Sequence, residues 1–177
     1  MDNKNHETTM LTEMPTYLKE VYKRAWLVPF LKGVCYLCTL LTVAAFAFVL
    51  ISNAPGDMRL ALKLVIVTLV PFVGVTVFRR ILKAPRPCEL YDMSSLGDRA
   101  PKKSGKSFPS RHVFSSFVIG ASLCFIAPVL GAIVLFLGIA LGACRVLLGY
   151  HFLRDVVAGG LIGVVCGTIG MLIVNIG

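Results

Sequence analysis

The stretch that decides the fold of this 177-residue chain is Val113–Cys144, which reads VFSSFVIGASLCFIAPVLGAIVLFLGIALGAC. It contains 32 residues and no Asp, Glu, Lys or Arg. As one helix rising 1.5 Å per residue it would be ~48 Å long, whereas the hydrocarbon core of a bilayer is ~30 Å thick. Pro128 and Gly131 lie near its middle, where a helical hairpin can turn. The stretch therefore predicts two membrane-spanning helices joined by a tight turn.

Three other uncharged runs have the same character, at 33–56, 64–78 and 156–177. The chain is 56% apolar, and only 15% of its residues are charged, compared with about 25% in soluble domains. Together the runs predict five spans, at roughly 30–51, 61–78, 110–127, 130–148 and 156–176. We therefore expect an all-α membrane protein, a bundle of about five transmembrane helices in a single domain over residues 1–177.

The N-terminal region has a different composition. Residues 1–13 are polar and are expected to be disordered, and no apolar core of a cleaved signal peptide precedes the first span. Residues 14–27 mix aromatic and aliphatic side chains with Lys and Arg, which predicts a helix in the membrane interface with Trp26 at headgroup depth. The alternative is that this segment belongs to a sixth span, but it carries too many charges to cross the membrane alone.

The polar residues of greatest interest gather on one side of the membrane in this span order. The end of the second span, the start of the third, the end of the fourth and the start of the fifth must share a side. These four ends carry Arg79, Arg80, Lys83, Arg86, Ser110, Arg111, His112, Arg145, His151 and Asp155. Basic residues there also anchor headgroups, and Ser110 also suits a helix N-cap. Nevertheless, two of the three histidines beside an aspartate and several arginines predict a functional site, because ionisable groups near hydrocarbon are costly.

The residue types suit chemistry on a phosphate ester. Arginine binds phosphate oxygens through its planar fork, and a helix beginning after Ser110 offers free backbone N–H groups. His151 and Asp155 are four residues apart and lie on one face of a helix, so the carboxylate can orient the imidazole as a nucleophile. His112 has a side chain suited to protonating a leaving alkoxide.

Three motifs carry a family resemblance. They read Arg79-x6-Arg86-Pro87, Pro109-Ser110-Arg111-His112 and Cys144-Arg145-x5-His151-x3-Asp155. In order and internal spacing the chain resembles the type 2 phosphatidic acid phosphatase family, whose motifs are K-x6-R-P, P-S-G-H and S-R-x5-H-x3-D, and which includes vanadium haloperoxidases. Three positions depart from the pattern: Arg79 stands for Lys, Arg111 for Gly and Cys144 for Ser.

The resemblance implies a metal-independent lipid phosphate phosphatase. His151 would attack phosphorus and form a phosphohistidine, Asp155 would hold its tautomer, and His112 would protonate the leaving group. The phosphate would be held by Arg79, Arg86, Ser110, Arg111 through its backbone, and Arg145. No cofactor and no metal are expected. The implied substrates are phosphatidic acid, phosphatidylglycerophosphate, undecaprenyl diphosphate and lipid-A phosphates. The partners expected are such a lipid and the bilayer, with no nucleic acid. The alternative is a non-catalytic or transport membrane protein that binds anionic headgroups.

The side of the membrane that the site faces is left open by the sequence. Sixteen of the 18 Lys and Arg residues lie on the site's side in this span order, which by the positive-inside rule favours the cytoplasm. The resemblance favours the outer face, where many bacterial members work.

Overall fold

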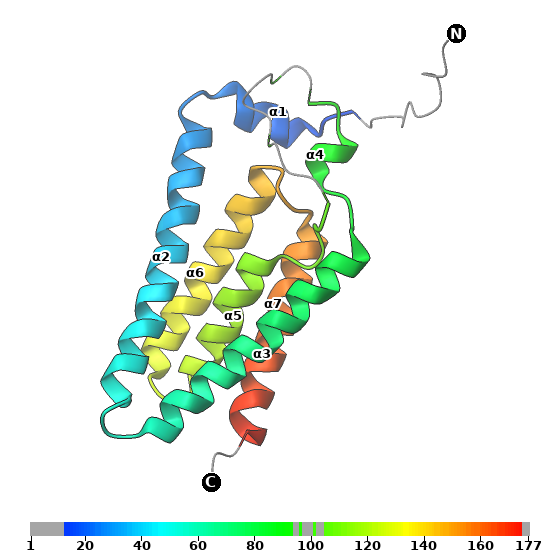
Figure 1. The fold of residues 1–177 in the computed structure, drawn as a ribbon. Helices are drawn as coiled ribbons and strands as arrows, with labels where there is room; N and C mark the ends of the chain where they lie inside the picture. Colours follow the sequence, from blue (N-terminus) through cyan, green and yellow to red (C-terminus); the bar gives the residue numbers. More distant parts are fainter. Residues whose placement is uncertain (1–12, 94–95, 97–100, 102–104, 175–177) are drawn as a thin grey trace.

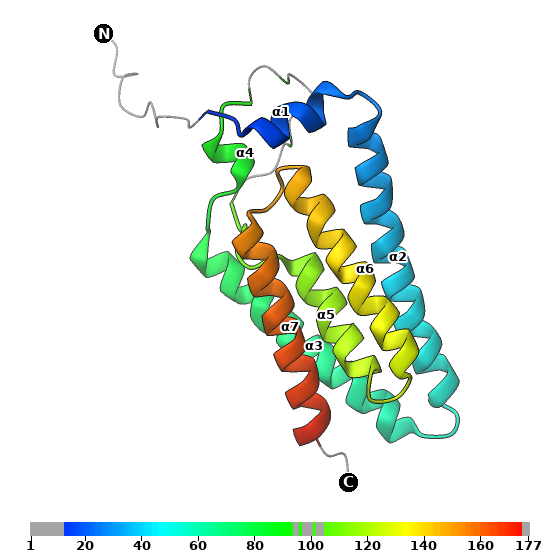
Figure 2. The same ribbon diagram turned by 180° about the vertical axis from the view of Figure 1, so that it is seen from behind.

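The computed structural model describes residues 13–93, 96, 101 and 105–174. Its helices are α1 (Thr16–Lys23), α2 (Leu27–Asn53), α3 (Met58–Leu82), α4 (Pro87–Leu90), α5 (Arg111–Leu123), α6 (Pro128–Leu147) and α7 (Leu153–Ile173). In Figures 1 and 2, α2, α3, α5, α6 and α7 run side by side as a bundle, and α1 lies across the end at which α2 begins. The predicted all-α membrane bundle is confirmed.

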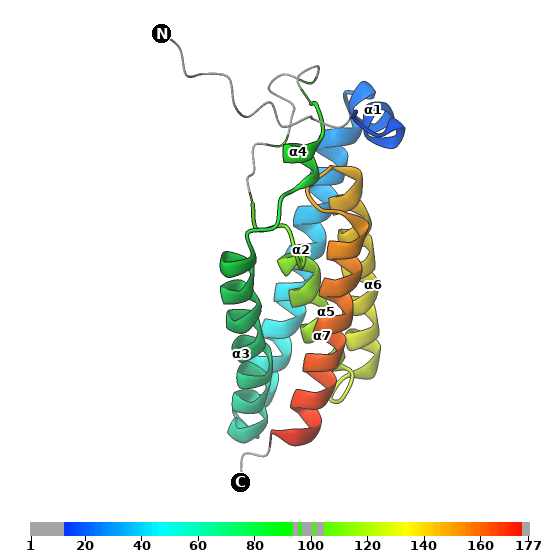
Figure 3. The same cartoon turned by 90° about the vertical axis from the view of Figure 1, so that its right-hand side faces the viewer.

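Four helical segments are long and apolar enough to cross a membrane: Leu27–Asn53, Met58–Leu90, Pro128–Leu147 and Leu153–Ile173. The predicted span at 110–127 forms the shorter α5, which has 13 residues and is therefore ~20 Å long. Eight of those residues are buried, because α5 contacts α2, α3, α6 and α7 (Figure 3). A helix enclosed by neighbouring helices does not have to match the thickness of the hydrocarbon. The predicted hairpin turn follows it, between Leu123 and Pro128.

Glycines bring α5 and α7 into close contact. A Cβ atom on Gly159 would lie 2.7 Å from the carbonyl oxygen of Ser110, and one on Gly163 would lie 2.8 Å from that of Phe114. The two helices therefore touch backbone to backbone at the end where both begin. There the Ser110 N–H donates to the carbonyl oxygen of Asp155 over 2.8 Å. This packing joins two of the three sequence motifs.

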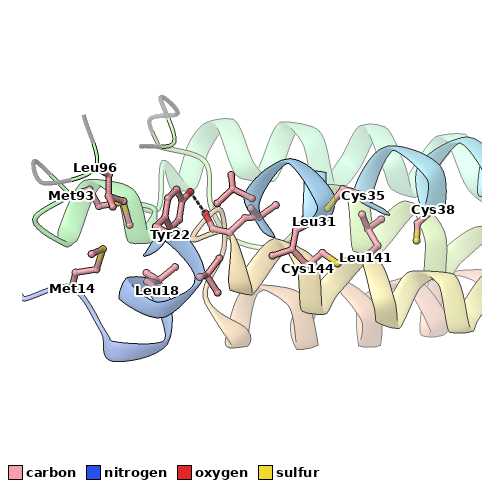
Figure 4. Close-up of a cluster of buried hydrophobic side chains, with 13 residues drawn as sticks. Met14, Leu18, Tyr22, Leu31, Cys35, Cys38, Met93, Leu96, Leu141 and Cys144 are labelled. Carbon is pink, nitrogen blue, oxygen red and sulfur yellow. Dashed lines mark hydrogen bonds between the residues drawn. The ribbon is translucent and has the colours of Figure 1, made fainter. Parts of the chain in front are cut away.

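The helix predicted within 14–27 is present as α1, and its apolar face packs against the bundle. Leu18 and Tyr22 are buried, and the Tyr22 hydroxyl donates to the carbonyl oxygen of Leu148 over 3.1 Å (Figure 4). Trp26, at the turn into α2, is 62% exposed. The interfacial depth of α1 and the side of the membrane it faces stay predictions, and the disorder expected for 1–13 concerns residues that, except for Glu13, lie outside the described part of the chain.

Candidate active site

A turn between α6 and α7 places His151. Gly149 adopts the left-handed conformation with φ of 67°, and the Tyr150 N–H donates to the carbonyl oxygen of Arg145 over 3.0 Å. This is the Schellman arrangement that commonly ends a helix, and it needs a residue that tolerates positive φ. The chain then turns back into the bundle, so that His151 is only 2% exposed. Two residues later α7 begins, and it presents Asp155 in its first turn.

The Nδ1 atom of His151 faces a polar network. It lies 3.7 Å from Oδ2 of Asp155 and 3.4 Å from Oγ of Ser107. The Ser107 hydroxyl donates to the same carboxylate oxygen, and the Phe152 N–H donates to it over 3.1 Å. These contacts fix the imidazole through Nδ1. The Nε2 atom is therefore the ring nitrogen available to a substrate.

The environment keeps this imidazole neutral. Burial lowers the pKa of His151 to about 4; the carboxylate of Asp155 opposes that shift, and the nearby guanidinium groups of Arg86 and Arg79 add to it. Since a free histidine has a pKa of about 6.5, the neutral form dominates near pH 7. A neutral imidazole has the lone pair that a nucleophile requires.

We expect the His151 ring in the substrate-free protein to stay neutral at pH 5.5 and to take up its proton only near pH 4. Because the folded-state pKa lies below the unfolded value of about 6.5, the contribution of His151 to stability is complete above that value. It is lost as the pH falls toward 4. Nitrogen NMR of histidine-labelled protein in detergent measures the titration, and a His151→Gln variant identifies the signal. A pKa at or above 6.5 would contradict this assignment.

Arg79 lies near the end of α3, and its side chain is buried. Its guanidinium donates to the carbonyl oxygens of Lys106, Ser107 and Pro109, with the Ser107 bond at 3.0 Å. These bonds occupy three of the five N–H donors of an arginine and leave two. Arg79 therefore holds the segment that leads into α5. Its predicted contact with phosphate stays a prediction that rests on the two remaining donors.

Arg86 connects the same segment to the α6–α7 turn. Its Nε donates to the carbonyl oxygen of Gly105 and its Nη1 to that of Tyr150, both over 2.9 Å. Glu89 completes the junction, since its carboxylate accepts the backbone N–H groups of Arg86 over 2.7 Å and of Gly105 over 2.8 Å. Arg86 thus ties together the residues that precede α5 and the residue next to His151.

The start of α5 presents Ser110 and His112. Ser110 is the N-cap residue, but its side chain makes no capping bond; the hydroxyl oxygen is buried and has no hydrogen-bond partner in the protein. Arg111 turns its guanidinium over the ring of Phe72, 5.6 Å from the centroid. The backbone of Arg111, at the start of α5, is therefore the part of this residue that is suited to binding an anion. His112 lines a cavity of about 330 Å³.

Arg145 lines the same cavity as His112. Its side chain is 8% exposed, its guanidinium carbon lies 5.5 Å from the centroid of the Tyr150 ring, and its Nε is buried with no hydrogen-bond partner in the protein. A buried donor without a partner costs free energy, which an anion in the cavity would recover. The structure thus brings the predicted residues to one end of the bundle, except for the side chain of Arg111.

Two residues that the motifs do not include are part of the arrangement, Ser107 and Glu89. Ser107 lies two positions before Pro109, and Glu89 lies three positions after Arg86, where a capping box places an acidic residue. The capping pattern offered a local signal for Glu89, whereas no local signal indicated Ser107. Among the described residues, no three His, Cys, Asp or Glu side chains form a group that could hold a metal ion.

Comparisons with known proteins identify a family and a shared fold. Residues 58–176 match the family model described as the PAP2 superfamily. The crystal structure of LpxE from Aquifex aeolicus is 23% identical, covers 88% of this chain and 92% of its own, and gives a TM-score of 0.66. A transmembrane PAP2-type phosphatidylglycerolphosphate phosphatase from Bacillus subtilis is 22% identical to this chain. Its match covers 87% of this chain and 80% of that protein, with a TM-score of 0.59. No curated protein sequence matches significantly.

Proposed function

This chain belongs to the PAP2 superfamily and is a multi-pass membrane phosphatase, and from that premise we propose that it hydrolyses a phosphorylated lipid through a phosphohistidine on His151. The observation that carries the proposal is a buried imidazole at the same end of the bundle as two buried hydrogen-bond donors that have no protein partner. The His151 ring is held at Nδ1, and the Ser110 hydroxyl and the Nε of Arg145 are buried without a protein partner. A phosphoryl group supplies the acceptors that both need.

The first chemical step forms a nitrogen–phosphorus bond. Nε2 of His151 attacks phosphorus while the bond from phosphorus to the ester oxygen breaks, and the electron pair of that bond stays on the ester oxygen. His112 gives a proton to this oxygen, so that an alcohol leaves. The carboxylate of Asp155 stabilises the imidazole ring of His151 as the ring becomes positively charged. Arg145 and the start of α5 stabilise the phosphoryl oxygens.

The second step returns the protein to its starting state. Water attacks the phosphohistidine, the nitrogen–phosphorus bond breaks, and its electron pair returns to Nε2 of His151. His112, now neutral, accepts the proton of the water, and inorganic phosphate leaves. In this scheme Arg79 and Arg86 act mainly by holding residues 105–109 against the reacting groups.

The position of the site supports a lipid as substrate. It lies where the membrane helices α3 and α6 end and α7 begins, at the end of the bundle that α1 crosses (Figure 1). That end is at the depth of lipid headgroups if the four apolar segments span the bilayer. Phosphatidylglycerophosphate is one candidate, since the Bacillus subtilis protein is by its name a phosphatase of that lipid. Phosphatidic acid, undecaprenyl diphosphate and lipid-A phosphates are the others.

The test is phosphate release by the purified protein in EDTA, with these four lipids supplied in mixed micelles. We expect release from at least one lipid at an unchanged rate when EDTA is present, because none of the proposed steps uses a metal ion. A protein that binds anionic headgroups without chemistry would retain the lipids and release no phosphate from any of them. That result would overturn the proposal.

A further inference from the structure

Helix α1 packs directly on the turn that places His151. Tyr22 is 2% exposed, and its hydroxyl donates to the carbonyl oxygen of Leu148, the residue that caps the end of α6 (Figure 4). Carbonyl groups in the last turn of a helix have no partner within the helix and need a donor from elsewhere. Tyr22 supplies this donor although it lies 126 positions earlier in the chain. Helix α1 therefore completes the end of α6, just before His151.

A second residue of α1 covers the same turn. Leu18 is fully buried, and a Cβ atom added to Gly149 would lie 3.3 Å from one of its methyl carbons. The methyl group of Met93, in the loop after α4, comes equally close. Gly149 is the residue with positive φ at which the chain reverses its direction. The cover that α1 provides thus lies on the bend itself.

The other end of the turn is held by Arg86, whose Nη1 donates to the carbonyl oxygen of Tyr150 over 2.9 Å. The carbonyl groups before and after Gly149 are therefore fixed by two separate parts of the chain, α1 and the segment after α3. His151 follows the second of these carbonyl groups directly. A shift of the turn must move the Nε2 atom of His151 relative to a bound phosphoryl group.

The Tyr22 hydroxyl keeps its proton under the conditions in which a neutral imidazole can attack phosphorus. Burial raises the pKa of Tyr22 to about 12, and the neighbouring side chains of Tyr150 and Cys88 add to the shift. The hydroxyl is therefore neutral near pH 7 and donates its hydrogen bond to the turn throughout the reaction.

From these contacts we propose that Tyr22 is a positioning residue, which acts on His151 through the backbone of the α6–α7 turn. The proposal rests on the proposed function. Tyr22 does not line the cavity that His112 and Arg145 share, and α1 precedes the residues 58–176 that match the family model. Its role is to keep Nε2 of His151 in line with phosphorus. It therefore acts on the rate of the chemical step and not on the affinity for the lipid.

The test replaces Tyr22 with phenylalanine, which removes the hydroxyl and keeps the ring in the core. The carbonyl oxygen of Leu148 then lacks this donor, so the turn shifts or admits water. We expect kcat for phosphate release to fall about tenfold, because small displacements of reacting atoms are costly. KM should keep its wild-type value, since Ser110 and Arg145, which are proposed to hold the phosphoryl group, lie outside the turn.

A second readout follows the His151 ring itself. Burial is the largest cause of its lowered pKa, and the charged groups that face it, Asp155, Arg86 and Arg79, are all retained in the variant. A loosened turn lets water reach the imidazole, so nitrogen NMR should show a higher pKa of His151 in Tyr22→Phe than in the wild-type protein. Leu18→Ala, which uncovers the bend, is expected to change kcat and this pKa in the same directions.

Tyr17→Phe is the matched control, because it makes the same chemical change on the same helix at a side chain that is 42% exposed. It should keep the wild-type kcat, KM and His151 pKa. Thermal unfolding is measured for each variant. If Tyr22→Phe unfolds at a lower temperature yet keeps the wild-type kcat and His151 pKa, α1 only stabilises the fold and the inference is overturned. Equal losses in the two tyrosine variants would overturn it as well. A wild-type protein that releases no phosphate from any lipid would overturn the proposed function, whereas the comparison of His151 pKa values would still test the inference.

Discussion

Replacing His151 with glutamine is expected to lower the rate of phosphate release by about 10⁴-fold or more, the range found when a nucleophile is removed from a hydrolase. The amide of glutamine can still meet Ser107 and Asp155, but its nitrogen lone pair is delocalised into the carbonyl group and its oxygen is a poor nucleophile for phosphorus. His151 is 2% exposed and its Nδ1 faces Asp155, so the buried position leaves little room for water to replace the imidazole. Steady-state assays on the lipid with the fastest turnover measure the loss.

Ser107→Ala is the matched control for this variant. It removes a contact at the same network but leaves the imidazole in place, since Asp155 still lies 3.7 Å from Nδ1. We expect a loss of only about tenfold, because Ser107 acts on the reaction through Asp155. If His151→Gln kept as much activity as Ser107→Ala, His151 would not be the nucleophile.

The second large effect is expected for His112→Ala, and its size should depend on the leaving group. For alkyl phosphates, whose alkoxide needs a proton to leave, general-acid catalysis is worth about 10²–10⁴-fold. For a nitrophenyl phosphate the departing anion is stable without a proton, so the variant should lose far less. The comparison uses kcat for short-chain alkyl and nitrophenyl phosphates with wild-type and variant protein.

Thr39→Ala provides the control, because it changes the lining of the same cavity and keeps the His112 imidazole. It should slow both classes of ester to the same small degree. Equal slowing of both esters by His112→Ala would show that His112 binds the substrate and does not protonate the leaving group.

The order of the helices and most of the site follow from the sequence for a simple physical reason. Uncharged runs of sufficient length must cross the membrane, and the crossing order fixes which ends meet. That reasoning alone puts His112, Arg145 and His151 at one end of the bundle, and they lie there in the folded chain. The length of α5 does not follow in this way, because an apolar run looks the same in a helix that faces lipid and in one enclosed by other helices.

The contacts of the loop side chains also cannot be predicted from the sequence. Ser107 meets Asp155 only because residues 105–109 are pulled against the bundle, and a loop serine has no periodic signature. Arg79 and Arg86 are expected at phosphate because they match a motif, yet most of their donors hold backbone carbonyl groups. A motif identifies which residue types meet, whereas the division of their hydrogen bonds depends on the folded chain.

The most direct test of the central claim is to trap the covalent intermediate. Wild-type protein is mixed with a nitrophenyl phosphate, whose fast first step lets the intermediate accumulate, then denatured in alkali and digested for mass spectrometry. The account predicts one phosphoryl group on His151, stable in alkali and lost in acid. A phosphoryl group on any other side chain, or none on the protein while phosphate release proceeds at its full rate, would contradict it.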